Sequence, residues 1–501
     1  MILHMIRGLK LGIIMCLLQG MLLSVFAKDY YITDFGAKAD GVTVNTRIIQ
    51  RAVDFVSENG GGRIIFTPGS FVTGTFYLKS NVTLHLEGGA SLLGSNNPWD
   101  YVIDPRIKWC SMIFAVNQTN IGITGKGTIN GRGYVTANNL VQYIHRGLFK
   151  DAMKLDRPYE GNRPMNIYFR ECTNVTVQDI TLKDPASWNQ TYDQCKNVLV
   201  EREIVDSKSY WNNDGIDIID CEDVVIRDCF IDAADDVYCF KSHSADHGCK
   251  NVLLENCVGR SSANGIKFGT VSRGFFKDFK IRNVTMYDTF RSAITFAAVD
   301  GADIENIEVD GVRAYNTGNV IFLRMGRRWD KGKEPSMKNI LIKNVYAEVP
   351  AGKPDEGYSY EGPVEDQPRN ISPASIVGIP GYRIQNVKME NMEIVSCGGG
   401  NPRYAYRGLT SAELDSIPEM IARYPEFSQF KELPAWGFYV RHADGITFEN
   451  VKFRAENKDY RPAIVTDDVN GLILKNVKFE EPNSDKKEQV FTYKTQNVVI
   501  E

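Results

Sequence analysis

A short phrase recurs along this chain: a turn residue, usually Asn or Asp, followed by alternating apolar residues. Five successive copies begin at Asn174, Asn197, Asp223, Asn251 and Asp278, so the period lies between 23 and 28 residues. Each period has room for several short strands with two-residue alternation, but not for the long 3.6-residue periodicity of a helical repeat. The chain is therefore predicted to fold as an all-β, right-handed parallel β-helix, in which each coil hydrogen-bonds to the next about 4.8 Å away.

Four cysteines stand at the same place in this phrase: Cys172, Cys195, Cys221 and Cys249. Equivalent positions in successive coils lie over one another, so these thiols are predicted to form a buried ladder of free cysteines rather than a metal or redox site. A second group resembles zinc spacing: Cys239, His243, His247 and Cys249. A surface loop between two strands is the interpretation that we favour for that segment.

The first 27 residues are predicted to be a secretory signal peptide. Arg7 and Lys10 precede an apolar run from Leu11 to Phe26, and small residues precede Lys28, where cleavage is expected. The run of about 16 residues is shorter than the ~20 that a membrane-spanning helix needs. The mature chain is therefore expected to be secreted or periplasmic, with no membrane span after removal of the signal.

Residues 28–501 are predicted to form a single parallel β-helix catalytic domain. An amphipathic segment, Thr46–Asn59, is expected to be a helix that caps the N-terminal end, because the first coil has no preceding neighbour. Some steps between copies of the phrase exceed one coil, which predicts insertions near residues 135–162, 351–375 and 398–434. These insertions are expected to protrude as loops or short helices at the rim of any groove.

The overall charge argues against a nucleic-acid partner. Lys and Arg number 58 against 62 Asp and Glu, which gives a net charge of −4 and no basic stripe to neutralise phosphates. We expect no cofactor and no resident metal, and a monomeric protein.

Three aspartates are candidates for catalysis. Asp214 lies in the turn Asn212-Asn213-Asp214-Gly215, and the pair Asp235-Asp236 follows about one coil later. Stacking would bring the three carboxyls within several ångströms of one another. Like charges that close raise at least one pKa, and a protonated carboxylic acid beside an ionised one is the pair that glycosidic hydrolysis needs. A solvated acidic turn and a calcium site are the alternatives.

The aspartate pattern resembles a known family. Asn-x-Asp-Gly-x-Asp followed one coil later by Asp-Asp is similar to the signature of glycoside hydrolase family 28, the polygalacturonases and rhamnogalacturonan hydrolases, and residues 34–41 and 60–69 resemble the opening of its bacterial members. The resemblance implies a right-handed parallel β-helix. It also implies that Asp235 is the general acid, and that Asp214 and Asp236 hold the attacking water in a single inverting displacement.

Two family motifs are altered. Ala263-Asn264-Gly265 stands where the family has Gly-His-Gly, and Ala293-Ile294-Thr295 stands where it has Arg-Ile-Lys. Asn cannot titrate as His does, and both substrate-binding cations are missing from their usual places. Five residues are predicted to bind the substrate by their position near the aspartates or the altered motifs: Asn212, Asn264, Lys267, Arg291 and Trp211.

The favoured hypothesis is a secreted, inverting glycoside hydrolase that cleaves α-glycosidic bonds in galacturonate-containing pectic chains. A polygalacturonase or exo-galacturonidase is expected, because large insertions at the rim favour a blocked cleft. Three alternatives stay open: a rhamnogalacturonan hydrolase, a calcium-dependent polyuronate lyase on the same architecture, and a glycan-binding β-helix without catalytic activity.

Overall fold

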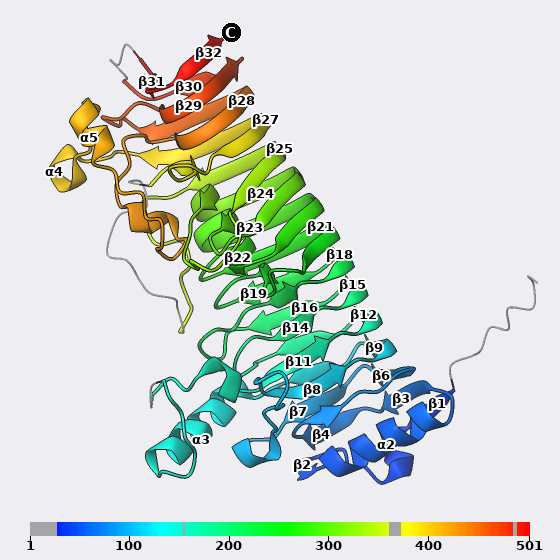
Figure 1. The fold of residues 1–501 in the computed structure, drawn as a ribbon. Coiled ribbons are helices and arrows are strands. Elements are labelled where there is room, and N and C mark those ends of the chain that lie inside the picture. Colours follow the sequence, from blue (N-terminus) through cyan, green and yellow to red (C-terminus); the bar gives the residue numbers. More distant parts are fainter. Residues whose placement is uncertain (1–27, 154–155, 360–371, 484–487) are drawn as a thin grey trace, which may run out of the picture.

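The computed structural model describes residues 28–153, 156–359, 372–483 and 488–501, and these build a column of stacked coils (Figure 1). The chain starts at the bottom of the column in this view and climbs one coil at a time to the C-terminus at the top. The strands belong to one continuous sheet, and the named strands pair in parallel. The predicted all-β, right-handed parallel β-helix is therefore confirmed.

A regular coil contains three strands. One coil consists of β14 (Gln190–Asp193), β15 (Lys196–Glu201) and β16 (Ile204–Ser207). The next coil repeats it as β17 (Ile216–Ile219), β18 (Glu222–Arg227) and β19 (Phe230–Ala233), and the pairs β14–β17, β15–β18 and β16–β19 are all parallel. This one-to-one register explains the period of the sequence, because each strand lies directly over its counterpart in the preceding coil.

The remaining strands continue this pattern, and in the later coils neighbouring strands merge into long bent ones. They are β1 (Asp29–Tyr31), β2 (Asp40–Val44), β3 (Gly62–Phe66), β4 (Gly69–Thr73), β5 (Phe76–Tyr77), β6 (Val82–Leu86), β7 (Ala90–Gly94), β8 (Ser111–Val116), β9 (Thr119–Gly125), β10 (Thr128–Asn130), β11 (Met165–Arg170), β12 (Thr173–Gln178), β13 (Thr181–Lys183), β20 (Tyr238–Ser242), β21 (Gly248–Ser261), β22 (Ile266–Ser272), β23 (Phe275–Ala298), β24 (Asp303–Met325), β25 (Ser336–Val349), β26 (Ala374–Val377), β27 (Ile384–Gly398), β28 (Phe438–Asn457), β29 (Ile464–Lys475), β30 (Lys478–Glu480), β31 (Val490–Tyr493) and β32 (Gln496–Ile500).

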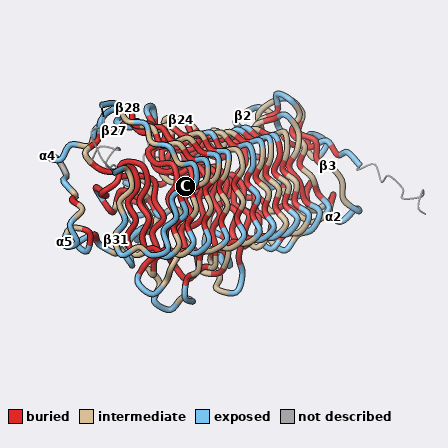
Figure 2. Tube along the Cα trace, turned by 90° about the horizontal axis from the view of Figure 1, so that it is seen from above, coloured by how far each residue is buried: buried red, intermediate tan, exposed pale blue. Residues whose placement is uncertain are grey.

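The hydrophobic core fills the inside of the column, and the buried residues lie along its interior (Figure 2). Alternate residues of each strand point inward, as Val175, Val198, Val224 and Val252 do at one stacked position. Because the coils are spaced by the parallel-sheet repeat, each inward side chain packs on its counterparts above and below. The core is thus continuous along the axis.

Two polar ladders follow the turns. The asparagine ladder comprises Asn81, Asn120, Asn174 and Asn197, each with a positive φ between 56° and 63°. Each side-chain amide donates to the amide oxygen of its predecessor, at 3.0, 2.8 and 2.9 Å. Asn tolerates the left-handed backbone better than most residues, which explains its recurrence at this turn.

The cysteine ladder is also present. Cys172, Cys195, Cys221 and Cys249 are buried, free and in register, each one residue before a paired strand position. The four residues with zinc-like spacing do not converge: Cys249 Sγ donates to Ile218 O in this ladder, Cys239 Sγ donates to Gly269 O, and His247 is exposed. The loop interpretation of that segment fits the structure.

Helix α2 (Thr46–Glu58) covers the N-terminal end of the column, as predicted (Figure 1). Its buried face, formed by Ile49, Ala52, Val53 and Val56, packs beside β3 and β5. Such a cap removes the apolar end of the first coils from water. Among the described residues, no helix is long and apolar enough to cross a membrane. The predicted signal peptide, residues 1–27, lies outside the described residues.

Two insertions project from one side of the column (Figure 1). The first contains α3 (Gly133–His145) and the short 3-10 helix η3 (Glu160–Asn162). Another contains α4 (Pro402–Ala405), α5 (Ser411–Asp415) and the 3-10 helix η5 (Phe427–Phe430). The third predicted insertion, near residues 351–375, lies partly outside the described residues. Short 3-10 helices also occur at η1 (Ile32–Phe35) and η2 (Pro98–Asp100).

Candidate active site

The coil register places Asp214 over Asp236. Both residues stand two positions before the first paired residues of β17 and β20, Ile216 and Tyr238. Backbone hydrogen bonds join the same turns, from Gly215 N to Asp236 O at 2.8 Å and from Asp235 N to Asn213 O at 3.2 Å. The two aspartate turns are therefore neighbours, one coil apart, as the spacing of the sequence predicted.

The three aspartates line a cleft of about 570 Å³. Asp214 and Asp236 are buried and 3% exposed, whereas Asp235 is half-buried. The insertions contribute to the walls, with Tyr159 and Glu160 from one side and Tyr424 from another. The other lining residues come from the coils: Trp109, Trp188, Asn212, Lys241, His243, Lys267, Thr270, Val271, Arg273 and Arg328.

Lys241 bridges Asp214 to a fourth carboxylate. Its Nζ lies 3.2 Å from Asp214 Oδ2, donates to Asp217 Oδ1 and lies 2.9 Å from Cys239 Sγ. Burial, together with the negative charge of Asp217, raises the pKa of Asp214 well above its usual range. Burial also raises the pKa of Asp217 to about 6, against the attraction of Lys241. Lys241 was not singled out from the sequence, and Asp217 entered there only as the last residue of the Asn-x-Asp-Gly-x-Asp motif.

Asp236 is held in its ionised form. Lys267 Nζ lies 2.6 Å from Asp236 Oδ2, and the side-chain amide of Asn264 donates to Asp236 Oδ1 at 2.8 Å. Burial raises the pKa of Asp236, but Lys267 and then Lys241 outweigh it and lower the value to about 2. Asn264 thus stands where a family histidine is expected and serves as a hydrogen-bond donor.

Asp235 differs from its neighbour in sequence. Burial, followed by the charge of Asp236, raises its pKa above the ordinary value. The cleft therefore places a carboxyl with a raised pKa, Asp235, next in the chain to one with a lowered pKa, Asp236. This is the division of roles that acid–base cleavage of a glycosidic bond requires.

The remaining predicted binding residues lie around the aspartates in different ways. Asn212 lines the cleft, and its side-chain oxygen accepts hydrogen bonds from Arg157 and Arg163. Trp211 is not among the lining residues, and its ring centroid lies 4.6 Å from the guanidinium carbon of Arg157. Arg291 is buried in an ion pair with Glu426 at 2.9 Å.

Arg291 is therefore neutralised by the 398–434 insertion rather than presented to the cleft, and the role predicted for it in binding stays a prediction. The same holds for Trp211. The aromatic rings that do line the cleft include Trp109 and Trp188, whose centroids are 4.6 Å apart, and Lys241 Nζ lies 4.3 Å from the Trp188 ring. Trp188, one of the aromatic residues that the sequence offers as candidates for stacking on sugar rings, stands in the coil before Asp214 at the equivalent register position.

The aspartates and Cys239 include a group of side chains close enough together to hold a metal ion. One oxygen of Asp214, one oxygen of Asp236 and Cys239 Sγ lie within 4.8 Å of one another. The Lys241 ammonium contacts Asp214 and Cys239, and the Lys267 ammonium contacts Asp236. Two protein cations thus compensate the charges that would otherwise attract a hard metal ion. This donor set fits resident calcium poorly.

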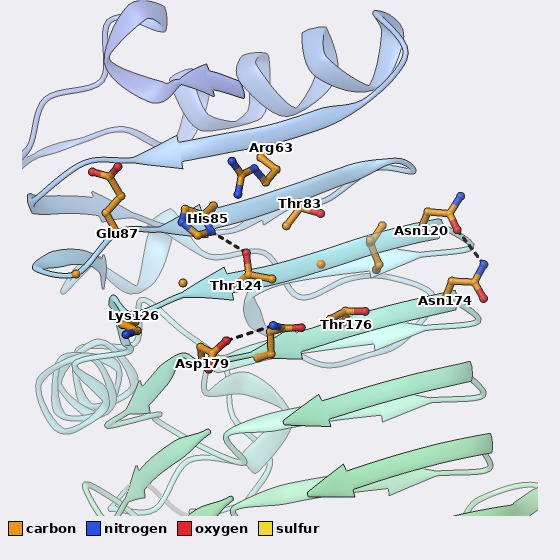
Figure 3. Close-up of a pocket in the computed structure, with 15 residues that line it drawn as sticks. Arg63, Thr83, His85, Glu87, Asn120, Thr124, Lys126, Asn174, Thr176 and Asp179 are labelled. Atoms are coloured by element: carbon orange, nitrogen blue, oxygen red, sulfur yellow. Dashed lines mark hydrogen bonds between the residues drawn. The ribbon is translucent and has the colours of Figure 1, made fainter. Parts of the chain in front are cut away.

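Another hollow lies on the flank of the column, over β3, β6, β9 and β12 (Figure 3). Its volume is about 930 Å³, and its floor carries short polar side chains such as Thr83, Thr124 and Thr176. The acidic residues in its lining are Glu87 and Asp179, and Asp179 is paired with Arg202 at 2.6 Å. The flank hollow is larger than the cleft, but among the described residues its lining has no group of three neighbouring aspartates like that of the cleft.

The fold and the cleft together define a parallel β-helix protein with a carboxylate site on the outside of its coils. Residues 68–310 match the model of glycosyl hydrolases family 28. That segment contains all three aspartates as well as Asn264 and Lys267. Over this segment, which is just under half of the chain, the protein matches glycosyl hydrolases family 28.

Two curated proteins are similar to parts of this chain. The chain is 29% identical over 245 residues to an exo-poly-alpha-D-galacturonosidase of Dickeya chrysanthemi, covering 41% of this chain and 40% of that one. It is 28% identical over 341 residues to a probable polygalacturonase of Vitis vinifera, covering 64% and 61%. The matches thus span less than two thirds of the length of both relatives.

A solved structure shows the same fold. The family 28 exopolygalacturonase of Yersinia enterocolitica superimposes with a TM-score of 0.62 at 19% identity, covering 94% of this chain and 78% of that one. At this identity the likeness bears on the architecture, and it confirms the β-helix over nearly the whole length of the chain.

Proposed function

We propose that this protein is a secreted glycoside hydrolase that cleaves α-glycosidic bonds of galacturonate-containing pectic chains with inversion at the anomeric carbon. The observation that carries the proposal is the aspartate cluster: Asp214 and Asp236 stack in successive coils beside Asp235, in one cleft. The pKa values of the adjacent Asp235 and Asp236 are displaced in opposite directions. The match of residues 68–310 to glycosyl hydrolases family 28 supports the same reaction class.

Asp235 is assigned as the general acid. The raised pKa of Asp235 favours its protonated form more than that of Asp236, and its partial exposure lets it contact the oxygen of the leaving sugar. Asp236, which Lys267 keeps ionised, is assigned as the base that accepts a proton from the attacking water. Each role depends on the environment of the carboxyl rather than on its chemical type.

Asp214 and Asp236 are assigned to hold the attacking water between them. The gap between their nearest carboxyl oxygens is at most 4.8 Å. A water that makes two hydrogen bonds of about 2.8 Å at a tetrahedral angle spans about 4.6 Å. The water would attack the anomeric carbon on the face opposite the leaving group, and a single displacement of this kind inverts the configuration.

The relatives and the cleft walls support a pectic substrate and action at chain ends. Exo-acting galacturonosidases are among the similar proteins. In this chain Tyr159, Glu160 and Tyr424 bring two insertions into the lining of the cleft, which favours a short pocket over an open groove. A rhamnogalacturonan hydrolase would use the same aspartates, so the sugar preference is tested below with both substrates.

A calcium-dependent lyase is the less favoured candidate, because Lys241 and Lys267 already compensate the aspartates. A lyase would release an unsaturated, ultraviolet-absorbing product and would lose activity in a chelator. The hydrolase proposed here keeps its activity in a chelator and forms a saturated product whose new anomer is opposite to that of the substrate.

The test is incubation of the full chain with galacturonan and rhamnogalacturonan fragments in chelator, with reducing ends and product anomers followed by proton NMR. Asp235→Asn is expected to lose about 10³-fold in kcat. Asp228→Asn is the matched control: Asp228 is an exposed turn residue of the same coil with φ 55°, and its variant should keep wild-type activity. Absence of new reducing ends from both substrates, or equal rates for wild type and Asp235→Asn, would refute the proposal.

Binding of the fragments without any product would instead favour a glycan-binding β-helix. Secretion rests on the sequence of residues 1–27 and is tested separately, since N-terminal sequencing of exported protein should begin at Lys28. Size-exclusion chromatography is expected to show a monomer.

A further inference from the structure

Four basic Lys or Arg side chains line the cleft among the described residues, and three of them face a carboxylate. Lys241 and Lys267 are paired with the aspartates described above. Arg328 makes two hydrogen bonds to Asp300, of 3.1 and 2.7 Å. The positive charges of these three side chains are therefore compensated by the protein itself, which leaves each of them little capacity to recognise an anionic ligand.

Arg273 is the fourth, and its surroundings differ. Its guanidinium carbon lies 4.5 Å from the centroid of the Trp329 ring, and Nη1 donates to the backbone oxygen of His243 at 3.3 Å. Its Nε is buried without a hydrogen-bond partner. Within the described part of the chain, no carboxylate oxygen lies within 4 Å of this guanidinium.

The position of Arg273 separates it from the catalytic groups. Asp214 and Asp236 precede strands β17 and β20, whereas Arg273 follows the last residue of β22 and its backbone pairs with Ser242 at the end of β20. The aspartates and Arg273 thus stand at opposite ends of the strands beneath the cleft. A sugar that contacts Arg273 is therefore displaced along the cleft from the scissile bond.

A guanidinium fixed in this way is preorganised for an anion. The Trp329 ring holds one of its faces, so the hydrogen-bonding edge stays in place and less side-chain entropy is lost on binding. A planar fork of N–H donors matches a carboxylate in bidentate geometry. An unpaired half-buried donor also gains most from a ligand that supplies the missing acceptor.

We propose that Arg273 is a specificity-determining residue that binds the free carboxylate of a uronate unit of the substrate, and that it replaces in this chain the altered Arg-Ile-Lys motif at residues 293–295. The inference rests on the proposed function, since it names the charged group of the same substrate. It requires that free-acid oligomers bind better than their methyl esters, which keep the shape and lose the charge.

The test compares trigalacturonate with its methyl ester, by steady-state kinetics and by isothermal titration calorimetry on the full chain. Arg273→Gln is expected to raise KM and the dissociation constant for the free acid about 10- to 100-fold, with kcat within threefold of wild type and little change for the ester. Arg273→Lys, which keeps the charge and loses the fork, should recover part of the affinity.

Arg327→Gln is the matched control, because Arg327 donates to the Tyr382 hydroxyl and is not among the lining residues. It should leave the acid-to-ester ratio unchanged. An equal loss on acid and ester for Arg273→Gln, or no loss, overturns the inference. Should wild type cleave neither oligomer, the proposed function fails while the binding arm still decides the role of Arg273, because calorimetry needs no turnover.

Discussion

Two stacks of polar side chains in this molecule use the same coil geometry and behave differently. In the asparagine ladder, each amide donates to the one before it and accepts from the one after it, at 2.8 to 3.0 Å. In the cleft stack, which we define as Asp214, Asp236 and Asn264, two of the three members are carboxyls. Amides are self-complementary at the coil repeat, and ionised carboxylates are not.

The difference shows how the cleft accommodates stacked carboxyls. Carboxyls repeated at about 4.8 Å need a proton or a cation between them. The chain supplies both: Lys267 neutralises Asp236, and the pKa of Asp214 is raised by burial and by Asp217. The asparagine ladder therefore consists of neutral amides, whereas the cleft stack contains ionisable carboxyls next to buried ammonium groups.

Replacing a carboxyl of the cleft stack with an amide, as in the asparagine ladder, should have the largest effect on activity and stability. Asp236→Asn is expected to lower kcat/KM for galacturonate oligomers about 10³-fold, because the base is removed. It also leaves Lys267 as an unpaired buried cation, which should lower the free energy of unfolding by about 3–5 kcal/mol. Steady-state kinetics and thermal unfolding measure the two losses separately.

The double variant Asp236→Asn/Lys267→Met separates catalysis from stability. It removes the unpaired cation, so the melting temperature should return toward that of wild type while the activity stays low. Recovery of activity in the double variant would show that Asp236 has no part in the chemistry. Asp228→Asn, in the same coil, again serves as the control that should change neither quantity.

Much of this stack was predictable because stacking is local. The spacing of the Asn-Asn-Asp-Gly turn and the Asp-Asp pair predicted that Asp214 and Asp236 would meet, and the register confirms it. Lys241 was missed although the signal was present: it lies in β20, two residues after Cys239, which pairs with Asp217. Side chains two residues apart in a strand lie on the same face of the sheet, so strand geometry predicts that Lys241 points toward the aspartates.

The walls of the cleft could not be predicted in the same way. Tyr159, Glu160 and Tyr424 come from insertions that interrupt the repeat, so no register relates them to the aspartates. The burial of Arg291 depends on one of these insertions, since Glu426 supplies its partner. A repeat predicts contacts between coils, but a loop outside the repeat is placed by tertiary packing that the period does not encode.

Glu203 is a carboxyl in the core that has no basic partner among the residues that the structure describes. Its burial predicts that the stability of the protein depends on pH, with an effect of intermediate size. Glu203 is 1% exposed and accepts a hydrogen bond from Gln190 at 2.7 Å. Burial raises its pKa to about 8, against the effect of that hydrogen bond. The pKa of Glu203 is higher in the folded chain than in the unfolded chain. The contribution of Glu203 to the free energy of unfolding is therefore fully present below about pH 4.3 and is lost as the pH rises toward 8.

Glu203→Gln should remove this loss. At pH 6.5 the loss in wild type amounts to about 3 kcal/mol, from about 1.4 kcal/mol per pH unit. Thermal unfolding at pH 4.5, 6.5 and 8 should therefore show a melting temperature that falls with pH more steeply for wild type than for Glu203→Gln. Glu222→Gln, at an exposed position, should follow wild type. Parallel pH curves for wild type and Glu203→Gln would contradict this account.

Introducing a carboxylate into the ladder should give the smallest effect. In Asn174→Asp the donor to Asn120 is lost, which leaves two acceptors facing each other and should lower the free energy of unfolding by about 1 kcal/mol at pH 7. The deficit should shrink below about pH 4, where the protonated acid donates again. The native ladder offers the reverse experiment at Asp223, which accepts from Asn251 at 2.7 Å. Asp223→Asn adds a donor facing Asn197 and should raise stability slightly. Equal melting temperatures for Asn174→Asp and wild type at pH 7 would show that the ladder owes its stability to backbone geometry rather than to amide pairing.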